Sequence, residues 1–155
     1  MKEAQGLNMV AEFHTLFDAP ILDTPQIPDK KRATLRVSLL QEELNELQEA
    51  IDNNDLVEVI DALADLQYVL SGAVLEFGLG EKFADIFAEV QRSNMSKACS
   101  SLQEAEATVE YYQNERNTEW YIVQKWDQYL VHRMEDNKIL KSVNYSPADL
   151  NKFLS

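Results

Sequence analysis

The sequence is poor in residues that break or cross-link a chain. It has four glycines, four prolines and one cysteine in 155 residues. So few chain breakers favour long helices over a turn-rich β fold. Cys99 has no second cysteine for an internal disulfide, which is typical of proteins from a reducing compartment. The first ten residues contain no apolar stretch like that of a secretory signal, so we expect a cytoplasmic protein.

Basic residues are also scarce. Lysine and arginine number 14 against 27 aspartates and glutamates, which leaves a net charge of −13. A protein that binds a nucleic acid polymer needs a basic face to replace counterions, so we expect no such partner. An acidic protein can still bind a nucleotide when a divalent cation lies between the two. No apolar run reaches the roughly 20 residues of a membrane-spanning helix, so we expect no membrane partner.

What the sequence has instead is helical periodicity. Apolar residues recur at helical spacing on either side of Asp18–Asp29, a connector that contains three prolines. Asp55 is a good N-cap, and Gly78 suits the left-handed residue that ends a helix. We therefore expect helices over residues 3–18, 30–52, 55–77 and 81–97. They form an all-α core of four helices at 1–98.

The amino-acid composition changes after residue 98. Residues 100–117 are polar and predict a further helix, while Trp120–Val123 and Tyr129–Val131 are aromatic and β-branched and predict a short hairpin. A turn is expected at Glu135–Asn137. Ser146–Asp149 has the cap, proline and acid of a helix start, so a terminal helix is expected there. We predict that residues 99–155 form an α/β appendage that packs on the core or on a partner subunit.

Acidic residues gather on the second and third predicted helices. Glu43 and Glu46 are three residues apart, which brings both to one patch of the helix that also carries apolar residues. Glu58, Asp61 and Asp65 lie within about 60° of one another on the next helix, by its 100° turn per residue. That helix is apolar almost all the way round, so we expect it to be buried.

Buried carboxylates need a positive partner, because an unpaired buried charge is costly. The stretch Leu56–Gly80 contains no lysine or arginine, and the second helix has its basic residues at the start. An all-oxygen ligand set selects hard cations, which indicates Mg²⁺ with Mn²⁺ as a substitute. The alternative is that these acids are solvated faces of surface helices.

The acids also carry a family resemblance. Glu42–Glu46 reads EELNE and Glu58–Asp61 reads EVID, which resembles the EExxE…ExxD pattern of the all-α nucleoside triphosphate pyrophosphohydrolases. That superfamily includes MazG-like proteins and phosphoribosyl-ATP pyrophosphohydrolases. The stretches DALADLQYVLSGAVLEFGL and EVQRSNMSK look like one MazG-like branch. The resemblance covers residues 7–98, and KILKSVNYSPADL looks like the tail of that branch.

The resemblance implies a four-helix MazG-like bundle that converts a triphosphate and water into the monophosphate and pyrophosphate. It implies a metal site formed by Glu43, Glu46, Glu58, Asp61 and Asp65. Asp61 completes the E-x-x-D pattern, whereas Asp65 stands in the sequence context that many relatives give the last acid, so both are retained. Either Glu46 or Glu43 is expected to orient or deprotonate the attacking water.

The resemblance also implies contacts to the substrate. Cations and polar groups at the end of the fourth helix are expected to meet the phosphates, and residues in the tail to close over the nucleotide. An aromatic wall on the first helix, at Phe13, His14 and Phe17, is a candidate for stacking on the base. The predicted substrate-binding residues are Arg92, Asn94, Lys97, His14, Phe17, Lys141 and Tyr145. The basic start of the second helix, Lys30–Arg36, is interpreted as a solvated surface.

The sequence leaves three functions to compare. The leading one is an Mg²⁺-dependent pyrophosphohydrolase of an NTP or dNTP that keeps the nucleotide pool clean. A phosphoribosyl-ATP pyrophosphohydrolase is a second, although that family is usually shorter and lacks the appendage. The third is a non-catalytic helical oligomer with a structural cation. Because the third helix has more apolar surface than one short core covers, we predict a homodimer or tetramer.

Overall fold

The structure is a computed structural model that describes residues 1–115 and 119–154. It is mostly helical, with five α-helices and a two-stranded antiparallel sheet among those residues. The prediction of a helical core followed by a small α/β appendage is confirmed at this level. The chain forms two compact units, one of Met1–Phe83 with Phe153 onward and one of Ala84–Lys152. The predicted domain boundary after residue 98 stays a prediction.

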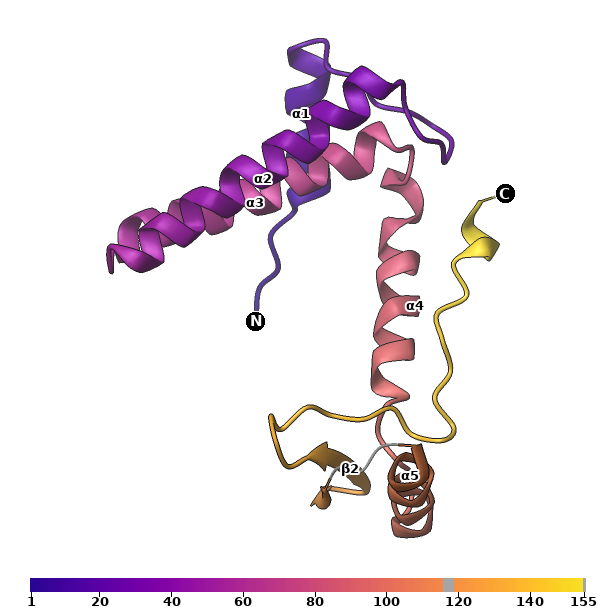
Figure 1. Ribbon diagram of the computed structural model, residues 1–155. Coiled ribbons are helices and arrows are strands. Elements are labelled where there is room, and N and C mark those ends of the chain that lie inside the picture. The colour runs from indigo at the N-terminus through magenta and orange to yellow at the C-terminus, as the bar shows by residue number, and fades with distance from the viewer. Residues whose placement is uncertain (116–118, 155) are drawn as a thin grey trace. The chain divides into compact units, whose positions relative to one another are not determined.

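The first unit is organised by a long helical hairpin. Helices α2 (Lys30–Asp52) and α3 (Leu56–Glu76) run side by side in opposite directions, and α1 (Gly6–Leu16) packs on α3 (Figure 1). Each long helix begins at an aspartate whose carboxylate accepts two backbone N–H groups, Asp29 for α2 and Asp55 for α3. The predicted cap at Asp55 is therefore confirmed. These caps satisfy donors that a helix start otherwise leaves unpaired.

Helix α3 ends where the connector from α1 returns. Gly78 has φ +68, as the sequence predicts for a residue that ends the helix. A Cβ at this position would lie 1.9 Å from the carbonyl oxygen of Thr24, so only glycine fits. The connector continues along this end: the amide of Leu22 donates to the carbonyl of Leu75. Glycine and connector together fix the end of the hairpin.

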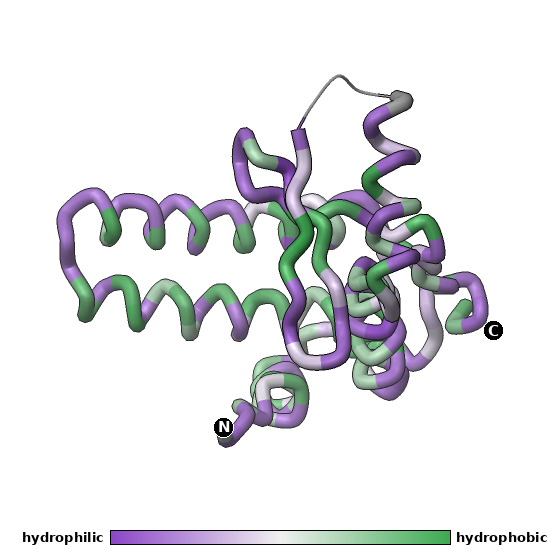
Figure 2. Tube along the Cα trace, turned by 90° about the horizontal axis from the view of Figure 1, so that it is seen from below, coloured by the Kyte–Doolittle hydropathy of each residue, from purple (hydrophilic) through white to green (hydrophobic). Residues whose placement is uncertain are grey.

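The expectation that α3 is buried all the way round is wrong within this chain. Val57, Ile60 and Leu63 are 72%, 62% and 53% exposed. Hydrophobic residues recur along both long helices of the hairpin, as the colouring of Figure 2 shows. Burial is concentrated at the end of α3, over residues 71–76. The single-chain core is too small to cover both sides of α3, so its apolar stripe stays uncovered.

The fourth predicted helix is shorter than expected. A 3-10 turn, η1 (Gly80–Lys82), precedes α4 (Phe83–Met95), whose ends lie within two residues of the prediction. A four-helix bundle is not confirmed, because α4 belongs almost entirely to the second unit. No single helix of the described residues is long and apolar enough to cross a membrane, although α3 and Gly80–Met95 pass that test together as a bent pair.

The second unit contains the predicted hairpin. Strands β1 (Trp120–Lys125) and β2 (Gln128–Arg133) pair antiparallel around a two-residue loop, and α5 (Leu102–Glu115) packs on β2. The predicted helix over 100–117 is confirmed to residue 115, and the remainder lies outside the described residues. A small apolar core joins these elements. Its buried members are Cys99, Ala105, Trp120, Val131 and Leu140.

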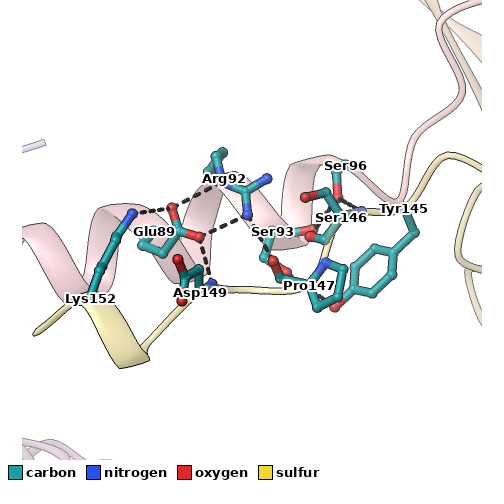
Figure 3. Close-up of polar contacts among 9 residues, drawn as sticks. All are labelled: Glu89, Arg92, Ser93, Ser96, Tyr145, Ser146, Pro147, Asp149 and Lys152. Atoms are coloured by element: carbon teal, nitrogen blue, oxygen red, sulfur yellow. Dashed lines mark hydrogen bonds and ion pairs between the residues drawn. The ribbon is translucent and has the colours of Figure 1, made fainter. Parts of the chain in front are cut away.

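The predicted terminal helix at Ser146–Asp149 is wrong. The segment is irregular, and a single 3-10 turn, η2 (Asn151–Phe153), follows it. Its backbone groups bond to α4 instead of to one another (Figure 3). The amide of Ser146 donates to Ser96 Oγ at 3.0 Å, and the amide of Asp149 donates to Glu89 Oε1 at 2.8 Å. The carbonyls of Ser146 and Pro147, which a first helical turn would use as acceptors, accept from Ser96 Oγ and Arg92 instead.

Candidate active site

The α2–α3 hairpin brings acids from both helices to one cavity. The cavity has a volume of about 370 Å³ and lies near the turn between the helices. Glu46 from α2 and Glu58 from α3, two of the predicted metal ligands, both line it. Glu49 and the cap Asp55 also line it, and Glu49 is not among the residues that the motif predicts for the site. Four carboxylates thus surround one open, polar space.

Among the acids of this region, Glu43 is the one whose pKa is most affected by its surroundings. Its Oε2 is shielded from solvent and accepts no hydrogen bond within the described chain. Burial raises the pKa of Glu43 above its ordinary value, and the nearby negative charges raise it further. Those charges come from both helices, namely Glu46, Asp65, Glu42 and Asp61 in order of effect. Glu43 therefore lies in a field of four other carboxylates, and among the described residues no cation is one of the groups that affect it most.

The remaining predicted ligands are less enclosed than expected. Glu58, Asp61 and Asp65 are exposed in this chain, because the face of α3 that carries them is uncovered. The argument from burial therefore applies to Glu43 and not to these three. Among the described residues, no three Asp, Glu, His or Cys side chains converge closely enough to hold a metal ion as they stand. The five-residue metal set stays a prediction.

The other end of the same hairpin contains a carboxylate that is fully paired. Glu76 is completely buried and accepts hydrogen bonds from Arg32 and Arg36, with Arg36 Nη2 at 2.5 Å. Burial alone would raise the pKa of Glu76, but the two guanidinium groups hold it below its usual range. The interpretation of Lys30–Arg36 as a solvated surface is wrong for Arg36, which is buried.

His14 belongs to this paired cluster. Its Nε2 lies 3.1 Å from Arg36 Nη2, and its Nδ1 lies 2.8 Å from the carbonyl oxygen of Pro20. Because arginine only donates, Nε2 accepts and Nδ1 carries the hydrogen. Gly72 makes room for this contact, since a Cβ there would lie 2.6 Å from Arg36 Nη1. His14 is buried with both ring nitrogens engaged, so its predicted role in base stacking stays without support.

The other predicted aromatic residue is open to solvent. Phe17 is exposed, and its ring lies 4.4 Å from that of Phe13, centre to centre. Phe13 in turn meets the edge of Tyr68 at 5.7 Å. Three aromatic rings, from α1, from the residue that follows it and from α3, thus form an exposed group on which a base can stack. The predicted contact of Phe17 with substrate remains a prediction.

The predicted phosphate-binding residues lie in the second unit and are engaged with the chain's own groups (Figure 3). Arg92 forms an ion pair with buried Glu89 and donates to the carbonyl oxygen of Pro147 at 2.9 Å. Lys97 Nζ donates to Asn94 Oδ1 at 2.8 Å. The Arg92 side chain joins α4 to the tail, and a role in binding phosphate would come in addition to these contacts.

Tyr145 and Lys141, the two tail residues predicted to close over the nucleotide, contact each other, and their contact with substrate stays a prediction. Lys141 Nζ lies 4.3 Å from the centre of the Tyr145 ring, a cation–π contact. The hydroxyl of Tyr145 lies 3.1 Å from Ser93 Oγ on α4. This hydrogen bond, followed by the charges of Lys141, Lys97 and Arg92, lowers the pKa of Tyr145 below its ordinary value. Positively charged side chains from the tail and from the end of α4 thus act on the Tyr145 hydroxyl.

Comparison with known proteins identifies the family. Residues 10–94, more than half of the chain, match the family described as phosphoribosyl-ATP pyrophosphohydrolase. An uncharacterised protein of Acanthamoeba polyphaga mimivirus is 24% identical over an aligned length of 243 residues, which covers 99% of this chain and 97% of that protein. The family match covers α2, α3 and all of the predicted metal ligands. The predicted superfamily is confirmed, and the family indicates a pyrophosphohydrolase, an acid anhydride hydrolase that acts on a nucleotide.

Proposed function

The chain belongs to the phosphoribosyl-ATP pyrophosphohydrolase family, and we propose that it hydrolyses a nucleoside triphosphate to the monophosphate and pyrophosphate with Mg²⁺. The observation that carries this proposal is Glu43. A shielded carboxylate oxygen that accepts no hydrogen bond from the described residues, in the field of four more carboxylates, calls for a cation as its partner. A magnesium ion bound together with a triphosphate supplies that cation and accounts for the cluster of acids.

The donor chemistry of the cluster fits this ion. The side chains with the largest effect on Glu43 are all carboxylates, and hard divalent cations prefer oxygen ligands of this kind. Glu43, Glu46, Glu58, Asp61 and Asp65 are the residues that would hold it. When bound, Mg²⁺ neutralises the phosphate oxygens and stabilises the charge that develops on the leaving pyrophosphate.

The chain's own part in the reaction is to position and deprotonate a water molecule. Glu46 is exposed within the cavity that Glu58 also lines, so its carboxylate is accessible to a water there. The water oxygen attacks the α-phosphorus, its proton passes to Glu46, and the bond between the α-phosphorus and the bridging oxygen breaks. Pyrophosphate leaves with the bonding electron pair. Glu43, whose Oε2 is shielded from solvent, is proposed to act as a ligand.

Phosphoribosyl-ATP is a second candidate substrate, and the family match supports it equally. Both substrates present the same α,β-phosphoanhydride to the acids, so the chemistry above applies to either. They differ in the group attached to the base, which lies away from the bond that breaks. A direct comparison of the two substrates is therefore part of the test.

We also propose that a second copy of the chain covers the exposed stripe of the hairpin. Val37, Leu44 and Ile51 are seven residues apart on α2 and all exposed, and α3 exposes Ile60 and others. Apolar stripes of this length in water mark association surfaces. Coverage there would bury the face of α3 that carries Asp61. Size-exclusion chromatography with light scattering should give a dimer or tetramer, and a monomer at micromolar concentration would refute this part.

The function is tested by pyrophosphate release in Mg²⁺. The substrates are a panel of ribo- and deoxyribonucleoside triphosphates together with phosphoribosyl-ATP. The proteins are the wild type, Glu46→Gln and, as a control, Glu12→Gln, which changes an exposed carboxylate on α1 outside the cluster. We expect turnover of at least one substrate that Glu46→Gln abolishes and Glu12→Gln leaves intact. No turnover of any substrate with Mg²⁺ or Mn²⁺ would refute the proposal.

A further inference from the structure

The β1–β2 sheet of the second unit has one covered edge and one open edge. On the outer side of β2, the backbone groups of Tyr129 and Cys99 exchange two hydrogen bonds, of 2.8 and 2.9 Å. Further along β2, the amide of Leu140 donates to the carbonyl of Val131 at 2.9 Å. Among the described residues the sheet has only two strands, and the outer side of β1 forms no backbone hydrogen bond. The edge of β1 is therefore available to another strand.

The pairing of β1 with β2 determines which backbone groups of β1 are unpaired. In an antiparallel pair, opposite residues alternate between those that exchange hydrogen bonds and those whose backbone groups face away from the partner strand. Tyr129 and Val131 use theirs on the outer side of β2. Their partners on β1 are Gln124 and Ile122, so the backbone groups of these two face outward from β1. By the same alternation, those of Trp120 face outward as well.

The composition of β1 favours pairing with another strand. Natural proteins protect an edge strand with a proline, a charge or a bulge. The stretch Trp120–Gln124 contains no proline and no charge, and it pairs with β2 residue by residue without a bulge. Four of its five residues are aromatic or β-branched, the types that favour strands. An edge of this kind is a template for a further strand.

Opposite charges flank this stretch. Glu119 precedes it and Lys125 follows it, and both side chains are exposed. Neither forms an ion pair with another described residue. Six positions of a strand span about 20 Å, so the two charges are too far apart to meet within one chain. Antiparallel pairing with a second β1 brings opposite ends together, so that each Glu119 lies beside Lys125 of the other copy.

We propose that β1 pairs antiparallel with β1 of a second copy and joins the two β-hairpins in one four-stranded sheet. Only residues whose backbone groups face outward can exchange bonds, and this condition limits the register. Of the pairings that meet it, the one centred on Ile122 overlaps the whole of β1. It places Trp120 opposite Gln124, and Glu119 opposite Lys125, at both ends. Each contact thus occurs twice about a two-fold axis, as in most dimers.

This contact goes beyond the proposed hydrolysis and does not depend on it. It uses the backbone and the flanking charges of β1, and none of the acids or exposed apolar residues of α2 and α3. A variant can therefore break this contact and leave the proposed contact between the stripes of α2 and α3 intact. If both contacts form, four copies make the smallest closed assembly.

Disulfide trapping tests the proposed register. Glu119→Cys and Lys125→Cys are made in the full chain, oxidised mildly alone and as an equal mixture, and analysed on a non-reducing gel. Opposite residues that do not exchange backbone bonds have Cα atoms about 4.5 Å apart, within the range of a disulfide. The native Cys99 is buried and will not compete. Lys138→Cys replaces an exposed lysine outside β1 and is the control partner for Glu119→Cys.

We expect a covalent dimer from the mixture of Glu119→Cys and Lys125→Cys. Either variant alone should stay monomeric on the gel, as should the mixture of Glu119→Cys with Lys138→Cys, because their thiols are not opposite one another.

A second measurement uses the mass of the assembly in light scattering. Gln124→Pro removes an outward N–H and keeps the bonds between β1 and β2, because a proline is tolerated where the N–H of an edge strand faces solvent. It should split the wild-type assembly into two equal parts. Gln124→Ala retains the N–H and should keep the wild-type mass.

Three results would overturn the proposal. One is no more covalent dimer from the test mixture than from the control mixture. Another is an equal yield of dimer from Glu119→Cys or Lys125→Cys alone, which excludes the register. The last is an unchanged mass in Gln124→Pro. A wild-type dimer that persists in Gln124→Pro belongs to another surface, such as the stripe of α2 and α3, whereas one that dissociates belongs to β1. The failure of either contact is thus distinguished from the failure of the other.

Discussion

Glu76 and Glu43 lie on the same pair of helices, and their pKa values shift in opposite directions. Burial raises the pKa of both. At Glu76 two arginines more than reverse that effect, whereas at Glu43 further carboxylates add to it. The difference shows that the partners of a buried acid, and not its burial, decide whether it is ionised. One end of the hairpin is neutralised by the chain, and the other is left for a ligand.

The two ends therefore have different consequences for the folded protein. Glu76, Arg36 and His14 join α3, α2 and α1 in one buried network, so this end stabilises the first unit. The acids around Glu43 repel one another and oppose folding, and the proposed cation would relieve that repulsion. Sites that are strained or unbalanced in this way are frequent where proteins bind ligands.

The largest expected effect is at the neutralised end. Glu76→Gln leaves Arg36 buried without its counter-charge, and breaking a buried pair from one side costs about 3–5 kcal/mol in the free energy of unfolding. Urea denaturation of the wild type, of Glu76→Gln and of the exposed control Glu81→Gln measures this. A loss equal to that of the control would show that the network does not stabilise the unit.

The next prediction concerns Glu43, at the other end of the hairpin, where removal of the acid should not destabilise the protein. Glu43→Gln removes one charge from the repelling cluster, so the apo protein should be as stable as wild type or more so. Turnover should fall by about hundredfold or more, the scale of a lost group in the chemical step. Pyrophosphate release and urea denaturation on the same samples test both halves. A variant that is strongly destabilised would place Glu43 among the structural acids.

A smaller effect is expected at Gly72. A Cβ at this position would lie 2.6 Å from Arg36 Nη1 and 3.1 Å from His14 Nε2, so Gly72→Ala pushes the guanidinium away from Glu76. Overpacking of this kind costs about 1–3 kcal/mol. Thermal unfolding beside Gly80→Ala, where a Cβ meets only the methyl group of Leu75 at 3.1 Å, provides the comparison. Equal losses in the two variants would argue against the clash.

The dependence of stability on pH should separate the two acids. The folded pKa of Glu43 is raised above 4.5, so stability is lost as pH rises from 4.5 through that folded value. The folded pKa of Glu76 is lowered, so stability is lost as pH falls from 4.5 through it. Glu43→Gln should reduce the dependence of stability on pH above 4.5, the upper limb. Glu76→Gln should reduce it below 4.5, the lower limb. Added Mg²⁺ should also flatten the upper limb in wild type, and unchanged limbs would contradict the assignments.

The smallest effect is local and lies in the tail. Glu89→Gln weakens the acceptor for the amide of Asp149 and removes the ion pair with Arg92. Hydrogen exchange at the Asp149 amide should therefore become faster, while exchange in β1 and β2 stays as in wild type. Unchanged exchange at Asp149 would mean that other contacts hold the tail on α4.

The sequence predicts the local structure well, because helix caps and breakers act within a few residues. Asp55, Gly78 and the hairpin at Trp120–Val131 follow from such signals. The pair of Arg36 and Glu76 spans 40 residues, and nothing near either residue signals the other. The tail was mispredicted because Ser146 and Asp149, which suit a helix start, donate to α4 instead.

The candidate site was only partly predictable for the same reason. The motif places Glu43, Glu46 and the α3 acids on adjacent helices, which the hairpin bears out. The apolar faces of α3 suggested burial, but one chain cannot cover them, so the inference from buried charge failed for Asp61 and Asp65. The motif already names Glu43, but the shielding of its Oε2 depends on how α2 and α3 pack and could not be predicted.

The most direct test of the unbalanced cluster is a titration of Mn²⁺ followed by electron paramagnetic resonance, in wild type and in Glu43→Gln. The account predicts that wild type binds Mn²⁺, that Mg²⁺ displaces it, and that Glu43→Gln weakens binding by about tenfold or more, the scale of losses at metal-site residues. Absence of Mn²⁺ binding by wild type, or equal affinity in Glu43→Gln, would contradict it.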